Sequence, residues 1–211
     1  MRLNNVAMAV VVAAVVATGT AHAGSIVYNL NSTAVGQFGA GPYGTVTLTT
    51  NGAHVDFVVD LAASLKLVNT GNTKSHSLFA LNGTGVAAAD IKNITNNTTA
   101  TFLAYTLAVA QPFGGFALGI KCVSCGQGGQ GATPGPLTFT VENAVLADFA
   151  VKSDKKKNGA YFSADVMTTK GKTGQLGATG AGAPIAIPDS GASLILLGGS
   201  LTVLGLVRRL M

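Results

Sequence analysis

An alternation of apolar and polar side chains, interrupted by a tight-turn signal, constrains this chain more than any other feature. Valine and leucine alternate with threonines in residues 44–50. Asn51-Gly52 follows, and this dipeptide is typical of a two-residue β-hairpin turn, because such turns need a left-handed backbone. Residues 54–61 then place an apolar side chain at every second position. A period of two indicates strands with one buried face, so the pattern predicts a β-hairpin.

Similar short apolar segments recur along the chain, separated by glycine, asparagine and proline. The further segments expected to form strands are residues 25–30, 77–81, 101–109, 113–120, 137–141, 146–151 and 160–166. Only 10% of the residues are charged and the chain has 28 glycines, which favours an extracellular all-β domain. We expect residues 24–170 to form an all-β, two-sheet sandwich of jelly-roll-like topology. Residues 126–136 are expected to form a glycine-rich loop, and residues 171–186 a flexible Gly-rich stalk.

The N-terminus has the three parts of a secretory signal peptide. Arg2 supplies a positive charge, residues 6–16 are continuously apolar, and Ala21 and Ala23 form an A-x-A cleavage site. Cleavage there would remove residues 1–23 as a signal helix and make Gly24 the first residue of the mature protein. The alternative is an uncleaved N-terminal anchor.

A second targeting segment occupies residues 187–211. It consists of the polar motif Ile187, Pro188, Asp189, Ser190 and Gly191, an uncharged run over residues 192–207, and the basic pair Arg208 and Arg209. As a helix the run reaches about 24 Å, slightly less than the ~30 Å hydrocarbon core, so we expect a short single transmembrane helix. The arginines predict that the extreme C-terminus stays in the cytoplasm. A buried core helix is the alternative interpretation.

The order of motif, apolar run and arginine pair resembles the sorting tail of PEP-CTERM proteins. The motif is most similar to the VPDSG variant, with Ile187 in place of valine. The resemblance implies export in a Gram-negative bacterium that makes exopolysaccharide, and processing of the tail by exosortase, a membrane protease-transpeptidase. Pro188-Asp189-Ser190 departs from the Pro-Glu-Pro core of the family, which leaves the matching processing enzyme open. A lipid-anchor signal of the GPI type is a poorer match, because such signals usually end without arginines.

The two cysteines of the chain, Cys122 and Cys125, are separated by two residues. Outside the cytoplasm two thiols this close most simply oxidise to each other, so we predict a disulfide at the start of the glycine-rich loop. Covalent haem would need a histidine where Gly126 stands. Zinc would need two more ligands, for which only His54 and His76 are available. Redox-active or free thiols are a further alternative.

No catalytic, cofactor-binding or metal-binding residues are expected. His54, Asp56 and Asp60 share the polar face of one predicted strand. That spacing fits a calcium site or a glycosidase acid pair, and the alternative is a solvated strand face. Two G-x-G-x-x-G matches are followed by a threonine-rich strand and by prolines, whereas a dinucleotide site needs a helix there.

The charge distribution also limits the partners. No arginine occurs between the two targeting segments, which argues against nucleic-acid recognition. Lys155, Lys156 and Lys157 beside Lys152 form the basic cluster of the domain. We interpret it as a solvated loop, with a contact to acidic polysaccharide as the alternative.

Together these features predict a non-enzymatic, exported protein, anchored in the envelope or sorted by exosortase, which is a structural or adhesive component of an exopolysaccharide or biofilm matrix. Its expected partners are an exosortase-type membrane protease, the membrane and exopolysaccharide, with no nucleic acid and no cofactor. The folded domain should lie outside the cytoplasm, first at the membrane and then at the cell surface or in the matrix. The alternative is a carbohydrate-binding module in which Tyr28, Tyr43 or Tyr161 stacks on sugar. A small secreted hydrolase is the third hypothesis.

Overall fold

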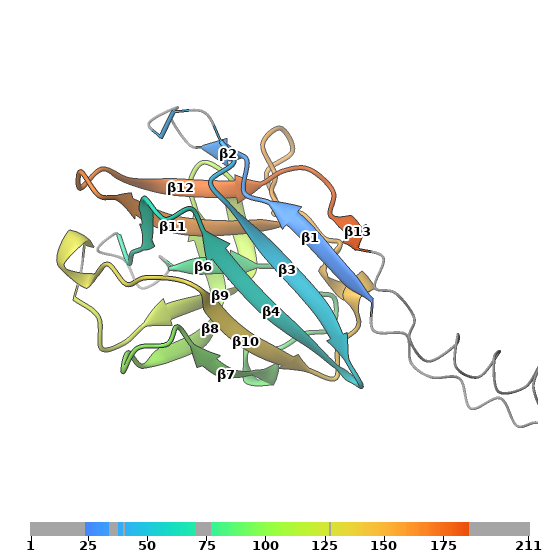
Figure 1. Ribbon diagram of the computed structural model, residues 1–211. Helices are drawn as coiled ribbons and strands as arrows, with labels where there is room; N and C mark the ends of the chain where they lie inside the picture. The colour runs from blue at the N-terminus through green and yellow to red at the C-terminus, as the bar shows by residue number, and fades with distance from the viewer. Residues whose placement is uncertain (1–23, 34–37, 40, 71–76, 127, 186–211) are drawn as a thin grey trace, which may run out of the picture. The chain divides into compact units, whose positions relative to one another are not determined.

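Two antiparallel β-sheets pack face to face in the computed structural model (Figure 1). The structure describes residues 24–33, 38–39, 41–70, 77–126 and 128–185. The first sheet has six strands, in the order β13 (Ala183–Ile185), β1 (Ser25–Asn29), β3 (Gly44–Asn51), β4 (His54–Leu61), β10 (Leu137–Glu142) and β7 (Ile91–Thr95). The second has seven strands, in the order β2 (Ser32–Thr33), β12 (Thr173–Ala178), β11 (Phe162–Thr168), β6 (Phe79–Leu81), β9 (Gly114–Cys122) and β8 (Phe102–Ala110), with β5 (Leu65–Leu67) paired to β11. The predicted two-sheet sandwich is confirmed, whereas its jelly-roll-like topology stays a prediction.

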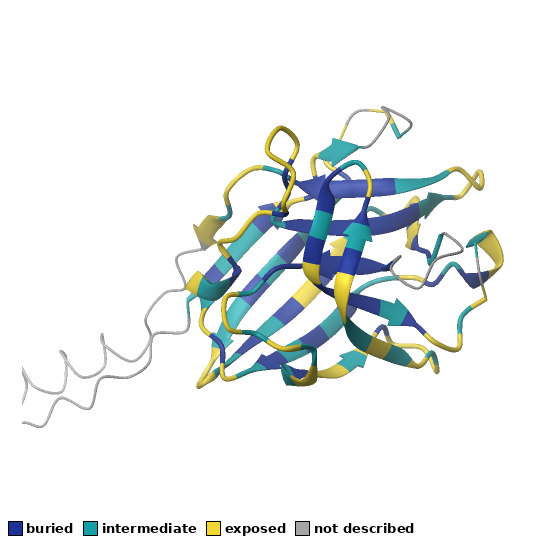
Figure 2. Ribbon diagram, turned by 180° about the vertical axis from the view of Figure 1, so that it is seen from behind, coloured by how far each residue is buried: buried dark blue, intermediate teal, exposed yellow. Residues whose placement is uncertain are grey.

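The predicted hairpin forms from β3 and β4, which pair along their whole length. Asn51 pairs with His54, so the connecting turn consists of Gly52 and Ala53 and lies one residue later than the Asn51-Gly52 signal suggests. Gly52 has a φ of 63°, the left-handed conformation for which glycine suits such a turn. On β4, Val55, Phe57 and Val59 are buried. The same alternation of buried and less buried positions runs along the strands in Figure 2, and exposed positions gather in the loops.

Aromatic rings from both sheets meet in the core. Phe57 of β4 stacks on Phe139 of β10 with ring centroids 4.5 Å apart. Phe162 of β11, in the opposite sheet, lies 6.1 Å from Phe57 and 6.0 Å from Phe79, again between ring centroids. All four rings are buried. Burial of one phenylalanine side chain stabilises a fold by about 1.5–3 kcal/mol, so this cluster helps to hold the two sheets together.

The predicted C-terminal boundary of the domain is wrong. Residues 171–186, expected to form a flexible stalk, contain β12, which pairs with β11, and β13, which pairs with β1. Leu176 of β12 is fully buried. Two of the glycines that suggested a linker allow close packing instead: a Cβ atom on Gly177 would lie 2.5 Å from the ring of Phe113, and one on Gly182 would lie 2.3 Å from the side chain of Ile26. The folded domain therefore continues beyond residue 170, as far as Ile185.

Residues 146–151, predicted to form a strand, instead contain the 3-10 helix η3 (Leu146–Phe149). The Asp148 carboxylate accepts a 2.9 Å hydrogen bond from the Val145 amide. An aspartate that binds nearby backbone offers that backbone an alternative to strand pairing.

Two further 3-10 helices are present, η1 (Ala88–Asp90) and η2 (Gly128–Gly131). Three further strands were not predicted from the sequence: β2 and β5 are too short to show a period, and β7 contains Asn93 at a φ of 53°.

Both targeting segments lie outside the described residues. This applies to the signal peptide, to the motif that begins at Ile187, to the apolar run 192–207, and to Arg208 and Arg209. Within the described part of the chain, no helix has the length and apolarity needed to cross a membrane. Signal cleavage before Gly24 and the role of the tail stay predictions.

Candidate functional site

Cys122, the last residue of β9, is bonded to Cys125. Their sulfur atoms lie 1.93 Å apart and their Cα atoms 5.4 Å apart. This confirms the predicted pairing, which closes a short loop where β9 leaves the sheet. Among the residues that the structure describes, no three His, Cys, Asp or Glu side chains gather as a metal site requires.

The disulfide is connected to the glycine-rich loop through Asn69. The Asn69 Nδ2 atom donates a 3.3 Å hydrogen bond to the carbonyl of Cys122, and the Asn69 carbonyl accepts one of 3.1 Å from the Gly128 amide. The loop also folds closely on itself, since a Cβ atom on Gly131 would lie 1.6 Å from the Gly126 carbonyl oxygen. The loop is therefore attached to the second sheet, and its glycines permit backbone contacts that no other residue allows.

Asp165 of β11 carries a fully buried carboxyl group that the sequence analysis did not single out. The Thr70 amide donates a 2.7 Å hydrogen bond to Oδ2 of Asp165, and the Thr70 hydroxyl donates to the same oxygen. Oδ1 is buried and has no hydrogen-bond partner among the described residues. Burial raises the pKa of Asp165 to about 7, although the bonds from Thr70 oppose this rise. Strand alternation alone would expose this residue, but β11 is covered on both faces along its first five residues.

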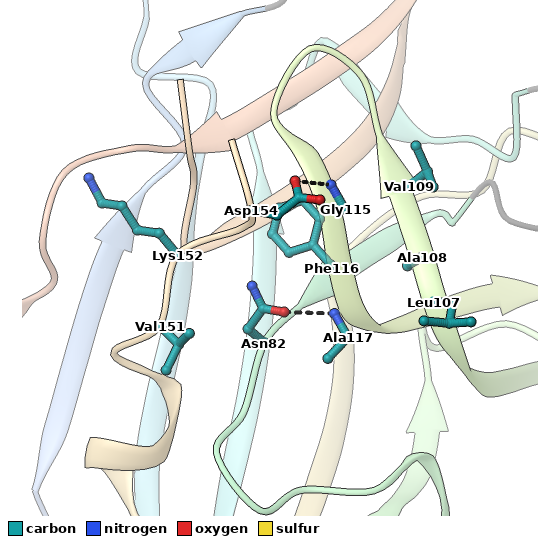
Figure 3. Close-up of a pocket in the computed structure, with 10 residues that line it drawn as sticks. All are labelled: Asn82, Leu107, Ala108, Val109, Gly115, Phe116, Ala117, Val151, Lys152 and Asp154. Atoms are coloured by element: carbon teal, nitrogen blue, oxygen red, sulfur yellow. Dashed lines mark hydrogen bonds between the residues drawn. The ribbon is translucent and has the colours of Figure 1, made fainter. Parts of the chain in front are cut away.

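A pocket of about 420 Å³ opens beside the hairpin of β8 and β9 (Figure 3). Its apolar lining includes Leu107 of β8, Phe116 of β9, and Val151 from the loop after η3. Its polar side chains include Asn82, which follows β6, and Asp154, from the same loop as Val151. Asp165 does not line this pocket.

Asn82 and Asp154 are both held by the backbone of β9. Strand β6 ends at Leu81, so the amides of β9 beyond that point find side chains as acceptors. The Asp154 carboxylate accepts a 2.7 Å hydrogen bond from the Gly115 amide, and Oδ1 of Asn82 accepts one of 2.6 Å from the Ala117 amide (Figure 3). The second polar atom of each group, Oδ2 of Asp154 and Nδ2 of Asn82, makes no hydrogen bond within the described residues and is available to a ligand.

The loop that carries Asp154 is fixed against the hairpin. Ser153 is buried and donates a 2.5 Å hydrogen bond to the Phe113 carbonyl, while its hydroxyl accepts one of 3.1 Å from the Ala160 amide. A Cβ atom on Gly115 would lie 2.9 Å from Oδ2 of Asp154, so glycine is what permits the close approach of the carboxylate. The polar groups of the pocket are therefore positioned in advance of any ligand.

Leu107 is the most unusual residue of the pocket. Its φ is 61° and its side chain is 77% exposed, in the interior of strand β8. The left-handed conformation costs a residue with a Cβ atom about 1–2 kcal/mol, and such conformations cluster at functional sites. Lys152 also lines the pocket, but its ammonium lies 5.0 Å from the ring centroid of Tyr161 and points away from Asn82 in Figure 3.

The tyrosines suggested for sugar stacking do not form a binding face. Tyr28 is 3% exposed and Tyr43 is 7% exposed. The Tyr28 ring packs edge-on against Phe162, with ring centroids 4.8 Å apart. The stacking hypothesis is therefore wrong for these two residues, because their rings are part of the core. Tyr161 is half-buried beneath Lys152.

The polar face of β4 carries His54, Asp56 and Asp60, as predicted, but does not assemble a site. One oxygen of Asp56 accepts a 2.7 Å hydrogen bond from the Thr140 hydroxyl, and the other accepts one of 2.9 Å from Nδ2 of Asn51. Both oxygens are thus already engaged in cross-strand contacts. This favours the interpretation of a solvated strand face.

The basic cluster Lys155, Lys156 and Lys157 is exposed in the loop between η3 and β11, as the solvated-loop interpretation predicts.

No family model, curated protein or solved structure matches this chain. The most specific features among its described residues are the Cys122–Cys125 disulfide and the pocket beside Leu107.

Proposed function

We propose that this chain is an exported surface protein, without catalytic activity, that serves as a structural or adhesive component of an extracellular polysaccharide matrix. The observation that carries this proposal is the Cys122–Cys125 disulfide, because structural disulfides persist in oxidising compartments and are rare in the cytosol. The signal-peptide pattern before Gly24 supports the same location.

The C-terminal tail supports a sorting route for this protein. Its motif, apolar run and arginine pair resemble a PEP-CTERM tail of the VPDSG type, so exosortase is the proposed partner at residues 187–191. The apolar run 192–207 would hold the protein in the membrane until the tail is processed. Arg208 and Arg209 would keep the last residues on the cytoplasmic side. The domain then reaches the cell surface or the matrix.

A hydrolase is less well supported by the described residues. The candidate acid on β4, Asp56, already accepts hydrogen bonds on both oxygens. The buried Asp165 is held by Thr70 and does not line the pocket. Asp56 therefore serves cross-strand contacts and Asp165 is enclosed in the fold, whereas the acid pair of a glycosidase flanks the bond to be cleaved.

Carbohydrate binding is the second candidate function, and the pocket beside Leu107 favours it. That pocket combines fixed polar side chains with an apolar lining, which is the usual composition of a small-molecule site. Binding there would not conflict with a matrix role, because an adhesive protein must contact the polymer at some point.

Location and tail processing can be tested together. Fractionation and external protease treatment of cells that express the full chain should place the domain outside the cytoplasm. Alanine at Pro188, Asp189 and Ser190 should keep the protein membrane-bound but stop processing of its tail. A control with alanine at Ser200 and Thr202, within the apolar run, should be processed as the unaltered chain is. Processing of the triple variant at the normal rate would exclude the motif as the recognition signal, and a cytoplasmic domain would refute the proposal.

A further inference from the structure

We infer that the pocket between Asn82, Asp154 and Leu107 binds a neutral saccharide that presents adjacent hydroxyl groups. This inference rests on the proposed function, since it identifies which part of a matrix polymer the domain would contact. It differs from the stacking hypothesis, because it depends on a leucine and two polar side chains rather than on exposed tyrosines.

The two fixed side chains offer one donor and one acceptor. Nδ2 of Asn82 can only donate a hydrogen bond, and Oδ2 of the Asp154 carboxylate can only accept one. A sugar hydroxyl both donates and accepts, so two adjacent hydroxyls can satisfy both groups. The bond to the carboxylate is charge-assisted and therefore the stronger of the two. An anionic sugar would bring a second negative charge to Asp154, which is why the inference is limited to neutral saccharides.

The apolar lining suits the other part of a sugar ring. Leu107 and Val151 are both exposed, at 77% and 39%, and both line the pocket. The C–H groups of a sugar ring can pack on these side chains and remove apolar surface from water. The volume of about 420 Å³ lies within the range of known small-molecule pockets, ~300–1,000 Å³.

A purely structural role for these residues explains only part of the arrangement. Capping of the β9 amides accounts for Oδ1 of Asp154 and for Oδ1 of Asn82. It does not account for Leu107, which is largely exposed and held in a left-handed conformation beside them. Strain of that kind persists where the surrounding structure enforces it, and it is often linked to function.

The test uses the full-length protein in a zwitterionic detergent, because glycoside detergents would compete for the pocket. Calorimetry measures binding of cello-, manno- and galacto-oligosaccharides, with polygalacturonate as the anionic counterpart. Asp154→Asn keeps an oxygen for the Gly115 amide but turns the ligand-facing atom into a donor. We expect it to weaken binding about tenfold or more, as loss of a hydrogen bond to a charged group does. Leu107→Ser should weaken binding several-fold.

Two matched variants serve as controls. Leu103→Ser changes the other exposed leucine of β8, which is 49% exposed and does not line this pocket. Asp90→Asn changes a carboxylate that likewise accepts a backbone hydrogen bond, from the Ala87 amide at 2.7 Å, but lies elsewhere. Both should bind as the unaltered protein does. The inference is overturned if no neutral saccharide binds or if only polygalacturonate binds. It is also overturned if both pocket variants bind as tightly as the unaltered protein. None of these results would change where the domain is found by fractionation and external protease treatment. Failure of the site and failure of the proposed function are therefore distinguishable.

Discussion

The backbone amide of Thr70 donates a 2.7 Å hydrogen bond to Oδ2 of Asp165, a residue 95 positions later in the chain. The hydroxyl of Thr70 donates to the same oxygen. These bonds attach the segment after β5 to the middle of β11. Because the other oxygen is buried without a partner among the described residues, the fold favours the protonated carboxyl, and the pKa of Asp165 rises to about 7.

We expect the domain to lose stability as the pH rises from about 4 to about 7. The pKa of an aspartate in the unfolded chain is ~3.9, so between these values the folded state holds a proton that the unfolded state has released. The contribution of Asp165 is complete below pH ~4 and is lost as the pH rises through about 7. It amounts to about 4 kcal/mol at most. Urea unfolding at a series of pH values measures it.

The variant Asp165→Asn isolates this contribution from the other acidic groups. Asparagine keeps an oxygen that can accept the bonds from Thr70 and has no proton to lose. The unfolding free energy of this variant should therefore fall less between pH 4 and pH 7 than that of the unaltered protein. Asp60→Asn, which changes an exposed aspartate of β4, is the matched control for replacing one carboxyl by an amide. If the difference in unfolding free energy between Asp165→Asn and the unaltered protein is constant from pH 4 to pH 8, Asp165 does not titrate in this range.

Gly177→Ala should destabilise the domain by about 1–3 kcal/mol, as overpacking of a core does. Its Cβ atom would lie 2.5 Å from the ring of Phe113, which is buried. Gly180→Ala is the matched control, because no atom lies within 4 Å of the Cβ position there. Denaturation midpoints of the two variants measure the difference. Equal midpoints would mean that β12 does not pack beneath Phe113.

The unreduced, exported protein should resist thiol alkylation, since Cys122 and Cys125 are bonded to each other. Intact mass should show two added groups only after reduction. Replacing both cysteines by serine should cost about 2 kcal/mol or less, because the closed loop is short and disulfides of short loops stabilise least. Two thiols that react before reduction, or a bound metal ion, would contradict the assignment.

Removal of residues 187–211 should leave a β-rich domain that melts cooperatively. Removal of residues 171–211 should prevent folding, because it deletes β12, which pairs with β11 on one side and with β2 on the other. Circular dichroism and thermal melts of both truncations test this. Failure of the shorter truncation would show that the tail belongs to the core, and success of the longer one would restore the stalk interpretation.

Local patterns predicted the hairpin of β3 and β4 and the pairing of Cys122 with Cys125, and the structure agrees. In both cases the interacting residues are near neighbours in the chain, so the geometry of a strand or a short loop decides the outcome. The same patterns failed for residues 171–186, where glycines that allow close packing have the same composition as a flexible linker. They also failed for Tyr28, because an amphipathic ring suits the core as well as a sugar-binding face.

The sequence by itself determined the all-β class, most of the longer strands, the inner face of the β3–β4 hairpin, and the disulfide, because alternation and spacing act over a few residues. Only the tertiary structure decided which strands distant in the chain are neighbours, that Asp165 is buried, and that Asn82 and Asp154 border one pocket. Their partners are distant in the chain: Asn82 lies 35 residues from Ala117, and Asp154 lies 39 from Gly115. No local pattern encodes such contacts, since they form only when the packing of the sheets brings separate segments together.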